Sequence, residues 1–242
     1  MEAAFSLSRN DGTSIEKVPF QTIYGCEECL SLTEKHNINP ALTVEELRPI
    51  NYFTMAKTMR AWENDAWDKH KLAERKKDLA EKRLFQDCYK MCELIRKCFD
   101  WGEDCKLIYD RVFVCCDDRK DIQAIALTSL VTRQRAEKND VYLKISLMVS
   151  RPQNLRASLN LTEGYRVQGA ARALLKKLAQ VTQEEQKHGI YLRSLELAQG
   201  FYTKFGFTPV EKGSTYIDKN EDGDYPMELS QEKVAALSMI SL

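Results

Sequence analysis

The sequence lacks an excess of charge of either sign, an apolar run of membrane-spanning length and an N-terminal secretion signal. Lys plus Arg number 36, as do Asp plus Glu, so the formal net charge of zero argues against nucleic-acid binding through overall basicity. No apolar stretch approaches the roughly 20 residues that a transmembrane helix needs. Met1–Asn10 shows no charged segment followed by an apolar one. We therefore expect a cytoplasmic protein whose eight cysteines stay as thiols.

A complete ligand set for a structural metal is also missing. Cys26 and Cys29 form a C-x-x-C pair and His36 follows, but no second C-x-x-C and no H-x₃-H pair accompanies them. A structural zinc site needs four ligands, so we expect no metal. Cys88 and Cys92 lie in a helical pattern, where cysteine behaves as a small apolar residue.

The N-terminal region, residues 1–104, is expected to be mostly helical. The stretch 53–99 contains neither Pro nor Gly, which indicates one very long helix or two helices that meet in the middle. Thr43 followed by Glu46 fits a capping box and predicts a helix start. Mixed charges over 68–83 are typical of a solvated helix with i,i+4 ion pairs; the alternative is a helical arm that binds a partner protein.

After residue 105 the apolar residues alternate, which is typical of strands. In the stretch 141–149 the odd-numbered residues should share one face of the strand and the even-numbered residues the other. A loop is expected at 150–165, followed by a helix. The predicted strands cover 107–116, 122–131, 141–149, 190–195, 208–217 and 225–229, and a short helix covers 198–205.

The start of the helix after the loop is suited to bind an anion. A helix N-terminus presents unpaired backbone N–H groups and a partial positive charge. Gly169, Ala170 and Ala171 keep the approach free of bulky side chains, so phosphate oxygens can reach the main chain. Arg166 and Arg172 flank the turn and add positive charge. The alternative is that the small residues only allow tight packing of the helix.

Two segments of this half resemble motifs of the GCN5-related N-acetyltransferases (GNAT). Residues 166–171 read R-V-Q-G-A-A and are similar to the family's R/Q-x-x-G-x-G/A signature. Residues 198–207 read A-Q-G-F-Y-T-K-F-G-F and are similar to its A-x-x-[FL]-Y-x-K-x-G-F segment, with Lys204 at the lysine position. The resemblance covers roughly residues 105–229.

The resemblance implies a mixed α/β fold with a central, mostly antiparallel sheet flanked by helices. Residues 1–104 would supply the first strand and helices plus an elaboration, and residues 105–242 would form the core with the acetyl-CoA site. The implied reaction transfers an acetyl group from acetyl-CoA to a primary amine. The amine would belong to a protein lysine, a protein N-terminus or a small molecule.

The resemblance also implies roles for individual residues. Tyr202 matches the tyrosine that protonates the leaving CoA thiolate, and a phenol with a pKa near 10 stays protonated for this task; the alternative is a packing role. Glu196 and Glu163 are candidates for the general base, and a chain of water molecules is equally open. The implied cofactor-binding residues are Leu147, Met148 and Val149, through their main chain, Arg166, Gln168, Gly169, Ala170, Ala171, Arg172 and Lys204.

Two features depart from the family pattern. Leu195 stands where the family often has Asn, and the loop 150–165 is longer than usual. Two rival functions remain open from the sequence. One is a non-catalytic interaction protein on a GNAT scaffold that binds a partner through 53–99. The other is a nucleotide-binding enzyme, which ranks last because G-x-x-x-x-G-K-[ST] and G-x-G-x-x-G are absent.

Overall fold

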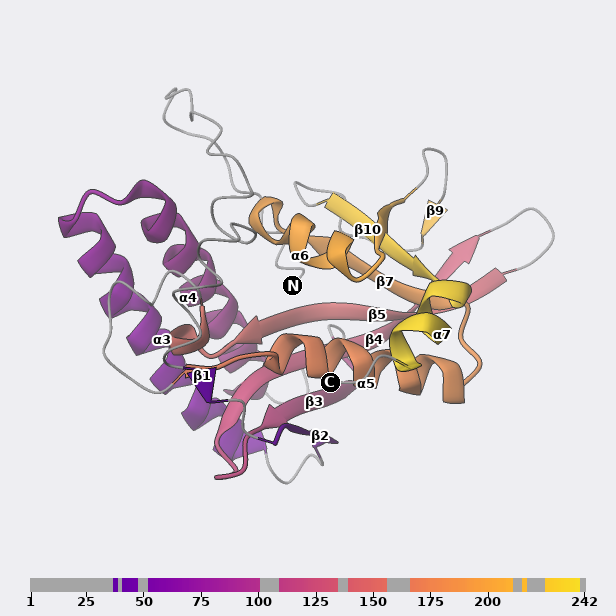
Figure 1. The fold of residues 1–242 in the computed structure, drawn as a ribbon, viewed down its shortest axis with the longest axis horizontal. Helices are drawn as coiled ribbons and strands as arrows, with labels where there is room; N and C mark the ends of the chain where they lie inside the picture. Colours follow the sequence, from indigo (N-terminus) through magenta and orange to yellow (C-terminus); the bar gives the residue numbers. More distant parts are fainter. Residues whose placement is uncertain are drawn as a thin grey trace. The chain divides into compact units, whose positions relative to one another are not determined.

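The computed structural model describes residues 37–38, 41–47, 52–100, 109–134, 139–155, 166–210, 215–216 and 225–239 (Figure 1). The chain divides into two compact units, and each is described by itself. The described residues of unit 1 fall within Leu130–Lys144 and Ala179–Met239, and those of unit 2 within Cys26–Ser129 and Ile145–Leu178. No helix among these residues has the length and apolarity to cross a bilayer.

The strands form a mostly antiparallel sheet in the order β2-β3-β4-β5-β7-β10-β8, with β9 paired to β4. This arrangement with its accompanying helices confirms the predicted mixed α/β fold. A separate parallel pair joins β1 and β6. The strands are β1 (Asn37–Ile38), β2 (Thr43–Glu46), β3 (Arg111–Cys116), β4 (Ile122–Gln134), β5 (Asn139–Ser150), β6 (Arg166–Val167), β7 (Gly189–Ser194), β8 (Thr208–Pro209), β9 (Thr215–Tyr216) and β10 (Tyr225–Ser230).

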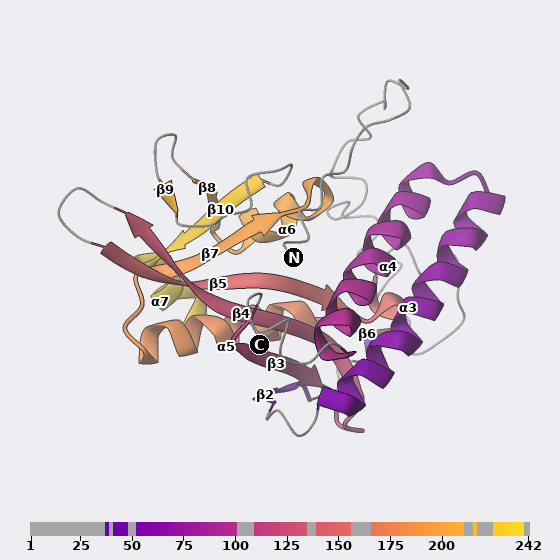
Figure 2. The same cartoon turned by 180° about the vertical axis from the view of Figure 1, so that it is seen from behind.

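Unit 2 contains two long helices, α3 (Tyr52–Arg75) and α4 (Leu79–Asp100), which lie side by side in both views (Figures 1 and 2). Of the two alternatives that the sequence left open, one very long helix or two helices that meet in the middle, the second is observed. The chain turns at Lys77, which has a φ of 58°. Asp78 then caps α4, because its Oδ1 accepts the Glu81 N–H at 2.9 Å.

The predicted helix start at Thr43 is wrong, because Thr43–Glu46 forms strand β2. This strand pairs with β3, from Thr43 opposite Cys116 to Glu46 opposite Phe113. Glu46 accepts two hydrogen bonds from the Arg111 guanidinium, at 2.7 and 2.8 Å. The Arg111 hydrogen bonds lower the pKa of Glu46. A partner 65 residues away in sequence therefore overrides the local capping pattern.

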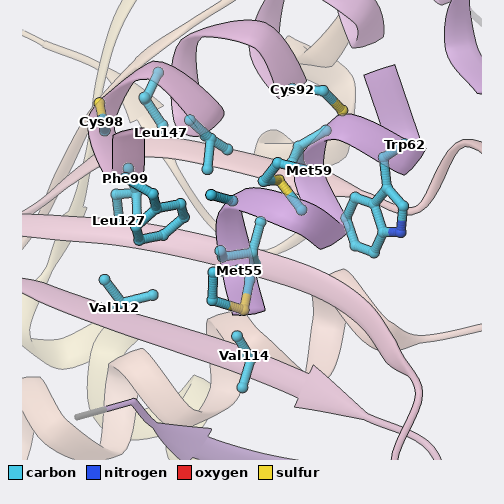
Figure 3. Close-up of a cluster of buried hydrophobic side chains, with 14 of the residues drawn as sticks. Met55, Met59, Trp62, Cys92, Cys98, Phe99, Val112, Val114, Leu127 and Leu147 are labelled. Carbon is cyan, nitrogen blue, oxygen red and sulfur yellow. The ribbon is translucent and has the colours of Figure 1, made fainter. Parts of the chain in front are cut away.

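The core of unit 2 lies between the helix pair and strands β3, β4 and β5 (Figure 3). In the charged stretch 68–83, Lys69 forms a predicted i,i+4 ion pair with Asp65. Lys82 pairs with Glu74 at 2.7 Å across the turn between the two helices. Fully burying one large apolar side chain stabilises a fold by about 1.5–3 kcal/mol. The core includes Met55, Met59 and Trp62 from α3, Cys92, Cys98 and Phe99 from α4, and Val112, Val114, Leu127, Leu147 and Val149 from the strands.

The alternation of buried and half-buried side chains along strand β5 is interrupted near its start, where two consecutive residues, Tyr142 and Leu143, are buried. Leu143 and every second residue up to Val149 are buried, as the alternation predicted. Tyr142 is also buried, whereas Val141 is only half-buried, so the face prediction is wrong for these two residues. In unit 1, Tyr142 packs into a cluster with Val131 and Tyr191. An aromatic ring that can fill this cluster takes the place of the smaller Val141.

Unit 1 contains short elements around β7 and β10. The predicted helix at 198–205 appears as a 3-10 turn, η5 (Glu196–Ala198), followed by α6 (Gln199–Lys204). The single strand predicted at 208–217 is replaced by β8 and β9, which pair with different strands. The sequence analysis named no element after 229, but α7 (Gln231–Met239) contacts β7 and β10 and buries Val234 and Leu237.

Met59 is fully buried between α3, α4 and the strands. We expect Met59→Ala to lower the free energy of unfolding by about 3 kcal/mol, because it removes apolar contacts and leaves a cavity. Urea denaturation measures the change. Leu79→Ala is the control, since Leu79 is 78% exposed at the start of α4 and its loss should cost less than about 0.5 kcal/mol. Equal effects of the two substitutions would contradict this account of the core.

Candidate active site

Gly169 sets the geometry of the turn before helix α5 (Ala170–Glu184). Its φ of +83° lies in the left-handed region, which side chains disfavour. Its carbonyl oxygen accepts the Ala173 N–H at 2.8 Å, so Gly169 is the cap of the helix. A helix start leaves its first N–H groups without an i−4 carbonyl inside the helix, and in α5 these groups include those of Ala170 and Ala171. This is the backbone arrangement of an anion site at a helix start.

Crowding does not explain the glycine. A Cβ placed on Gly169 would have Leu42 Cδ1 as its nearest neighbour, at an ordinary contact distance of 3.7 Å. Gly169 is exposed, whereas Ala170 and Ala173 behind it are buried at 2% exposure. Small residues thus serve two purposes at this helix start. The alanines allow tight packing on the inner side, and the glycine provides the backbone turn on the outer side.

Asn154 holds the chain just before this turn. Its Oδ1 accepts the Val167 N–H at 2.9 Å, from a 3-10 turn, η3 (Pro152–Asn154), that follows β5. Asn154 lies in the segment predicted as a loop, and the sequence predicts no functional role for it. Asn residues are frequent in loops, and only the fold brings this one to Val167, 13 residues later. The remainder of the predicted loop, 156–165 with Glu163, lies outside the described residues, as does the Arg166 side chain.

The candidate cofactor strand is the end of β5 in unit 2. Leu147 and Val149 are buried in the core under α3 and α4, and Met148 between them is half-buried. The side chains of Leu147 and Val149 are therefore occupied by packing. A ligand at this strand would bind the main chain, as the resemblance implies.

Tyr202 lies in α6 of unit 1 within a cluster of aromatic rings. Its ring meets Phe201 edge-on at 5.2 Å and Phe207 edge-on at 5.5 Å, and the residue is 8% exposed. The Phe207 N–H donates to the Tyr202 carbonyl oxygen at 3.2 Å. The Tyr202 ring is therefore packed among other rings, as the alternative packing role predicts.

The other two predicted site residues of unit 1 have exposed side chains. Glu196 is the first residue of η5, and Lys204 is the last residue of α6. Leu195, which departs from the family pattern, is half-buried and lies in the chain between the end of β7 and Glu196. The structure thus places Glu196, Tyr202 and Lys204 on one short helical segment, η5–α6.

The described cysteines are buried and poorly suited to act as nucleophiles. Burial raises the pKa of the Cys115 thiol to about 12. A hydrogen bond with Cys88, together with burial, raises the pKa of Cys92 well above its usual value. A thiol with a raised pKa is almost entirely protonated near neutral pH, and only the thiolate attacks. Cys88 and Cys92 behave as apolar core residues, as predicted, while Cys26, Cys29 and His36 lie outside the described residues.

Comparison with known proteins supports the sequence resemblance. Residues 148–229 match the model of a family described as acetyltransferase (GNAT) domain. This range contains the turn at Gly169 and the segment with Tyr202. The resemblance to the GNAT acetyltransferases is therefore confirmed for residues 148–229. A search of curated protein sequences finds no match.

The solved structures that this chain matches are distant in sequence. A mutant of the toxin AtaT, bound to the C-terminus of the antitoxin AtaR and acetyl-CoA, is 15% identical, with a TM-score of 0.42 over 62% of this chain and 85% of that chain. A Corynebacterium glutamicum protein described as histone acetyltransferase HPA2 and related acetyltransferase is 15% identical, with a TM-score of 0.41 over 79% and 96%. A GCN5-related N-acetyltransferase from Kribbella flavida is 10% identical, with a TM-score of 0.39 over 70% and 34%.

The positive φ of Gly169 generates a stability prediction. We expect Gly169→Ala to lower the free energy of unfolding by about 1 kcal/mol, because an L side chain is disfavoured in the left-handed region. Gly169→Asn should cost less, since Asn tolerates this conformation better. Thermal unfolding measures both variants. A fully stable Gly169→Ala variant would show that the turn does not require the left-handed conformation.

Proposed function

We propose that this protein transfers an acetyl group from acetyl-CoA to a primary amine. The observation that carries the proposal is the cap of α5. Gly169 has a positive φ and caps the start of the helix, within a segment that matches the GNAT domain. The acetyl-CoA pyrophosphate carries the negative charge that such a helix start favours.

In this proposal the main chain supplies most of the cofactor contacts. The residues proposed to bind pyrophosphate are Gln168, Gly169, Ala170, Ala171 and Arg172, through their N–H groups. Arg166 and Arg172 add positive charge, and Lys204 is a further cationic group on η5–α6. The main chain of Leu147, Met148 and Val149 would pair with the pantetheine arm, since the side chains of Leu147 and Val149 are buried in the core.

The proposed reaction is direct transfer without a covalent enzyme intermediate. The neutral amine attacks the thioester carbonyl carbon, and a main-chain N–H near Met148 or Val149 stabilises the negative oxygen that forms. The carbon–sulfur bond then breaks, and the Tyr202 phenol gives its proton to the CoA thiolate. The amine loses its own proton to a base. Glu196 is our candidate for that base, because its carboxylate is exposed on the same segment as Tyr202.

The competing proposal is a non-catalytic protein that binds a partner through α3 and α4. The inner faces of these helices are buried against the strands, so a partner would contact their outer faces. Trp67 is 41% exposed there, with Lys71 over its ring at 5.1 Å. Calorimetric titration with acetyl-CoA separates the two proposals. Absence of binding at millimolar acetyl-CoA would favour the non-catalytic protein.

Gly169→Glu should weaken acetyl-CoA binding by about 100-fold or more, because it places a negative charge where the pyrophosphate is proposed to bind. Isothermal titration calorimetry measures the dissociation constant. Gly169→Gln is the matched control, since it adds the same bulk and the same backbone strain without the charge. It should bind acetyl-CoA more tightly than Gly169→Glu. Unchanged affinity of the Glu variant would refute the assignment of this turn.

Tyr202→Phe should lower kcat by roughly 100-fold, the usual contribution of a general acid, and leave the acetyl-CoA dissociation constant within about twofold. The ring and its contacts with Phe201 and Phe207 are kept, so the substitution removes only the hydroxyl group. Release of free CoA with a reactive amine measures kcat. Tyr225→Phe, at an exposed tyrosine of β10, is the control. An unchanged kcat would assign the proton transfer to another group.

The class of amine acceptor requires a direct survey. Acetyl-CoA consumption should be followed by thiol release with lysine-containing peptides, peptides with free N-termini, polyamines and small primary amines. The acceptor that gives the highest kcat/KM identifies the class. Wild-type protein that binds acetyl-CoA but acetylates none of these would leave the acetyl-transfer proposal without its acceptor and count against it.

A further inference from the structure

A chain of hydrogen bonds in unit 2 leads from the turn between β3 and β4 to the main chain of Val167, directly before the proposed pyrophosphate turn. Gln123 Nε2 donates to Asp117 Oδ2 at 2.8 Å, and Asn154 Nδ2 donates to Gln123 Oε1 at 2.9 Å. Asn154 Oδ1 then accepts the Val167 N–H at 2.9 Å. Asp117 and Gln123 are each 1% exposed. Two side chains around the β3–β4 turn and one from the distant η3 turn therefore form one connected path that ends at Val167, two residues before Gly169.

Asp117 fixes the direction of every bond in this chain. Its Oδ1 accepts the N–H groups of Arg119 at 3.0 Å and Asp121 at 2.9 Å. An ionised carboxylate only accepts hydrogen bonds, so the amide group of Gln123 must turn its NH₂ toward Asp117. The Gln123 oxygen then faces Asn154, whose own NH₂ must turn toward it. The Asn154 oxygen is left facing away from Gln123, toward the main chain.

Two more contacts hold Asn154 in place. The Arg151 N–H donates to the Gln123 carbonyl oxygen at 2.9 Å, and the Asn154 N–H donates to the Arg151 carbonyl oxygen at 2.8 Å. The first bond attaches the start of the 3-10 turn η3 to strand β4, and the second closes the turn. The position of the Asn154 side chain is thus determined by the sheet.

The residue that Asn154 binds precedes the proposed pyrophosphate turn directly. Strand β6 has only two residues and pairs with the equally short β1, so little regular structure restrains it. A side-chain hydrogen bond to the main chain at Val167 restrains it further. Such outer contacts are how proteins hold binding groups in the geometry that a ligand requires.

We propose that Asn154, oriented by Gln123 and Asp117, is a positioning residue for acetyl-CoA binding. In this proposal Asn154 does not contact the cofactor. It acts through Val167, because it holds the main chain directly before the proposed pyrophosphate turn. This inference rests on the function proposed above. It adds a second set of residues, in the β3–β4 turn and after β5, to the site at α5.

Asn154→Ala should raise the acetyl-CoA dissociation constant and KM by about tenfold, because the turn loses its side-chain restraint. We expect kcat at saturating acetyl-CoA to stay within about twofold, since Tyr202 is unaffected. Gln153→Ala is the matched control, at a neighbouring residue of η3. A similar loss of affinity in both variants, or a fall in kcat with unchanged KM, would overturn the proposal.

The Val167 amide gives a readout that does not depend on activity. NMR hydrogen exchange should show that this N–H exchanges about tenfold faster in Asn154→Ala than in the wild type, relative to amides in the core of α5. Gln153→Ala should leave the exchange rate unchanged. Equal Val167 exchange in wild type and Asn154→Ala would refute the positioning role.

Asp117→Asn tests whether the chain acts as one unit. The Asn side chain has one acceptor oxygen where Asp has two. Its NH₂ group must therefore face either the main-chain N–H groups of Arg119 and Asp121, which also donate, or the NH₂ group of Gln123. If Gln123 turns over in response, Asn154 must also turn over and lose its acceptor position. We therefore expect faster Val167 exchange and a KM for acetyl-CoA raised in the same direction as in Asn154→Ala. Urea denaturation with exchange of other core amides separates this effect from general unfolding.

The outcomes keep this inference distinct from the proposed function. If the wild type binds acetyl-CoA and Gly169→Glu abolishes binding, the turn is the cofactor site. Unchanged affinity in Asn154→Ala would then refute only the positioning role. If Gly169→Glu binds normally, the assignment of the turn fails, and the positioning role in acetyl-CoA binding fails with it, whatever the Val167 exchange shows.

Discussion

The backbone of Gly169 is the constraint on which the candidate cofactor site depends. Only Gln168 and Gly169 separate the end of strand β6 from the start of helix α5, and Gly169 has a left-handed φ. The N–H groups at the start of α5, among them those of Ala170 and Ala171, form the part of the proposed site whose backbone geometry suits an anion.

The surroundings of this turn are built to keep it in place. On its inner side, Ala170 and Ala173 are buried and allow the helix to approach the sheet closely. Two residues before Gly169, the main chain of Val167 is bound by the Asn154 side chain, which in turn is hydrogen-bonded to Gln123. Beneath β5, the helices α3 and α4 complete the core that fixes the strand leading to η3. The helical region therefore has a structural role in unit 2, whether or not it also binds a partner.

Local patterns predicted much of the architecture correctly. Alternating apolar residues located β3, β4, β5, β7 and β10, and the absence of Pro and Gly located α3 and α4. The same kind of reasoning failed at Thr43, where pairing with β3 overrode a capping pattern, and at Tyr142, where an aromatic cluster changed the phase of β5. It also missed α7, whose sequence places only Val234 and Leu237 in the core. Each failure concerns a contact between residues far apart in the chain.

The sequence by itself determined the kinds of residue at the candidate site. Small residues at a helix start and two flanking arginines indicated an anion site before any geometry was known. The resemblance of this segment and of the Tyr202 segment to GNAT motifs implied acetyl-CoA as the ligand. Only the tertiary structure decided that Gly169 has a positive φ, that Leu147 and Val149 use their side chains for packing, and that Asn154 binds Val167. The physical reason is that a motif records neighbours along the chain. A hydrogen bond or a packed side chain depends on neighbours in space, which folding brings together.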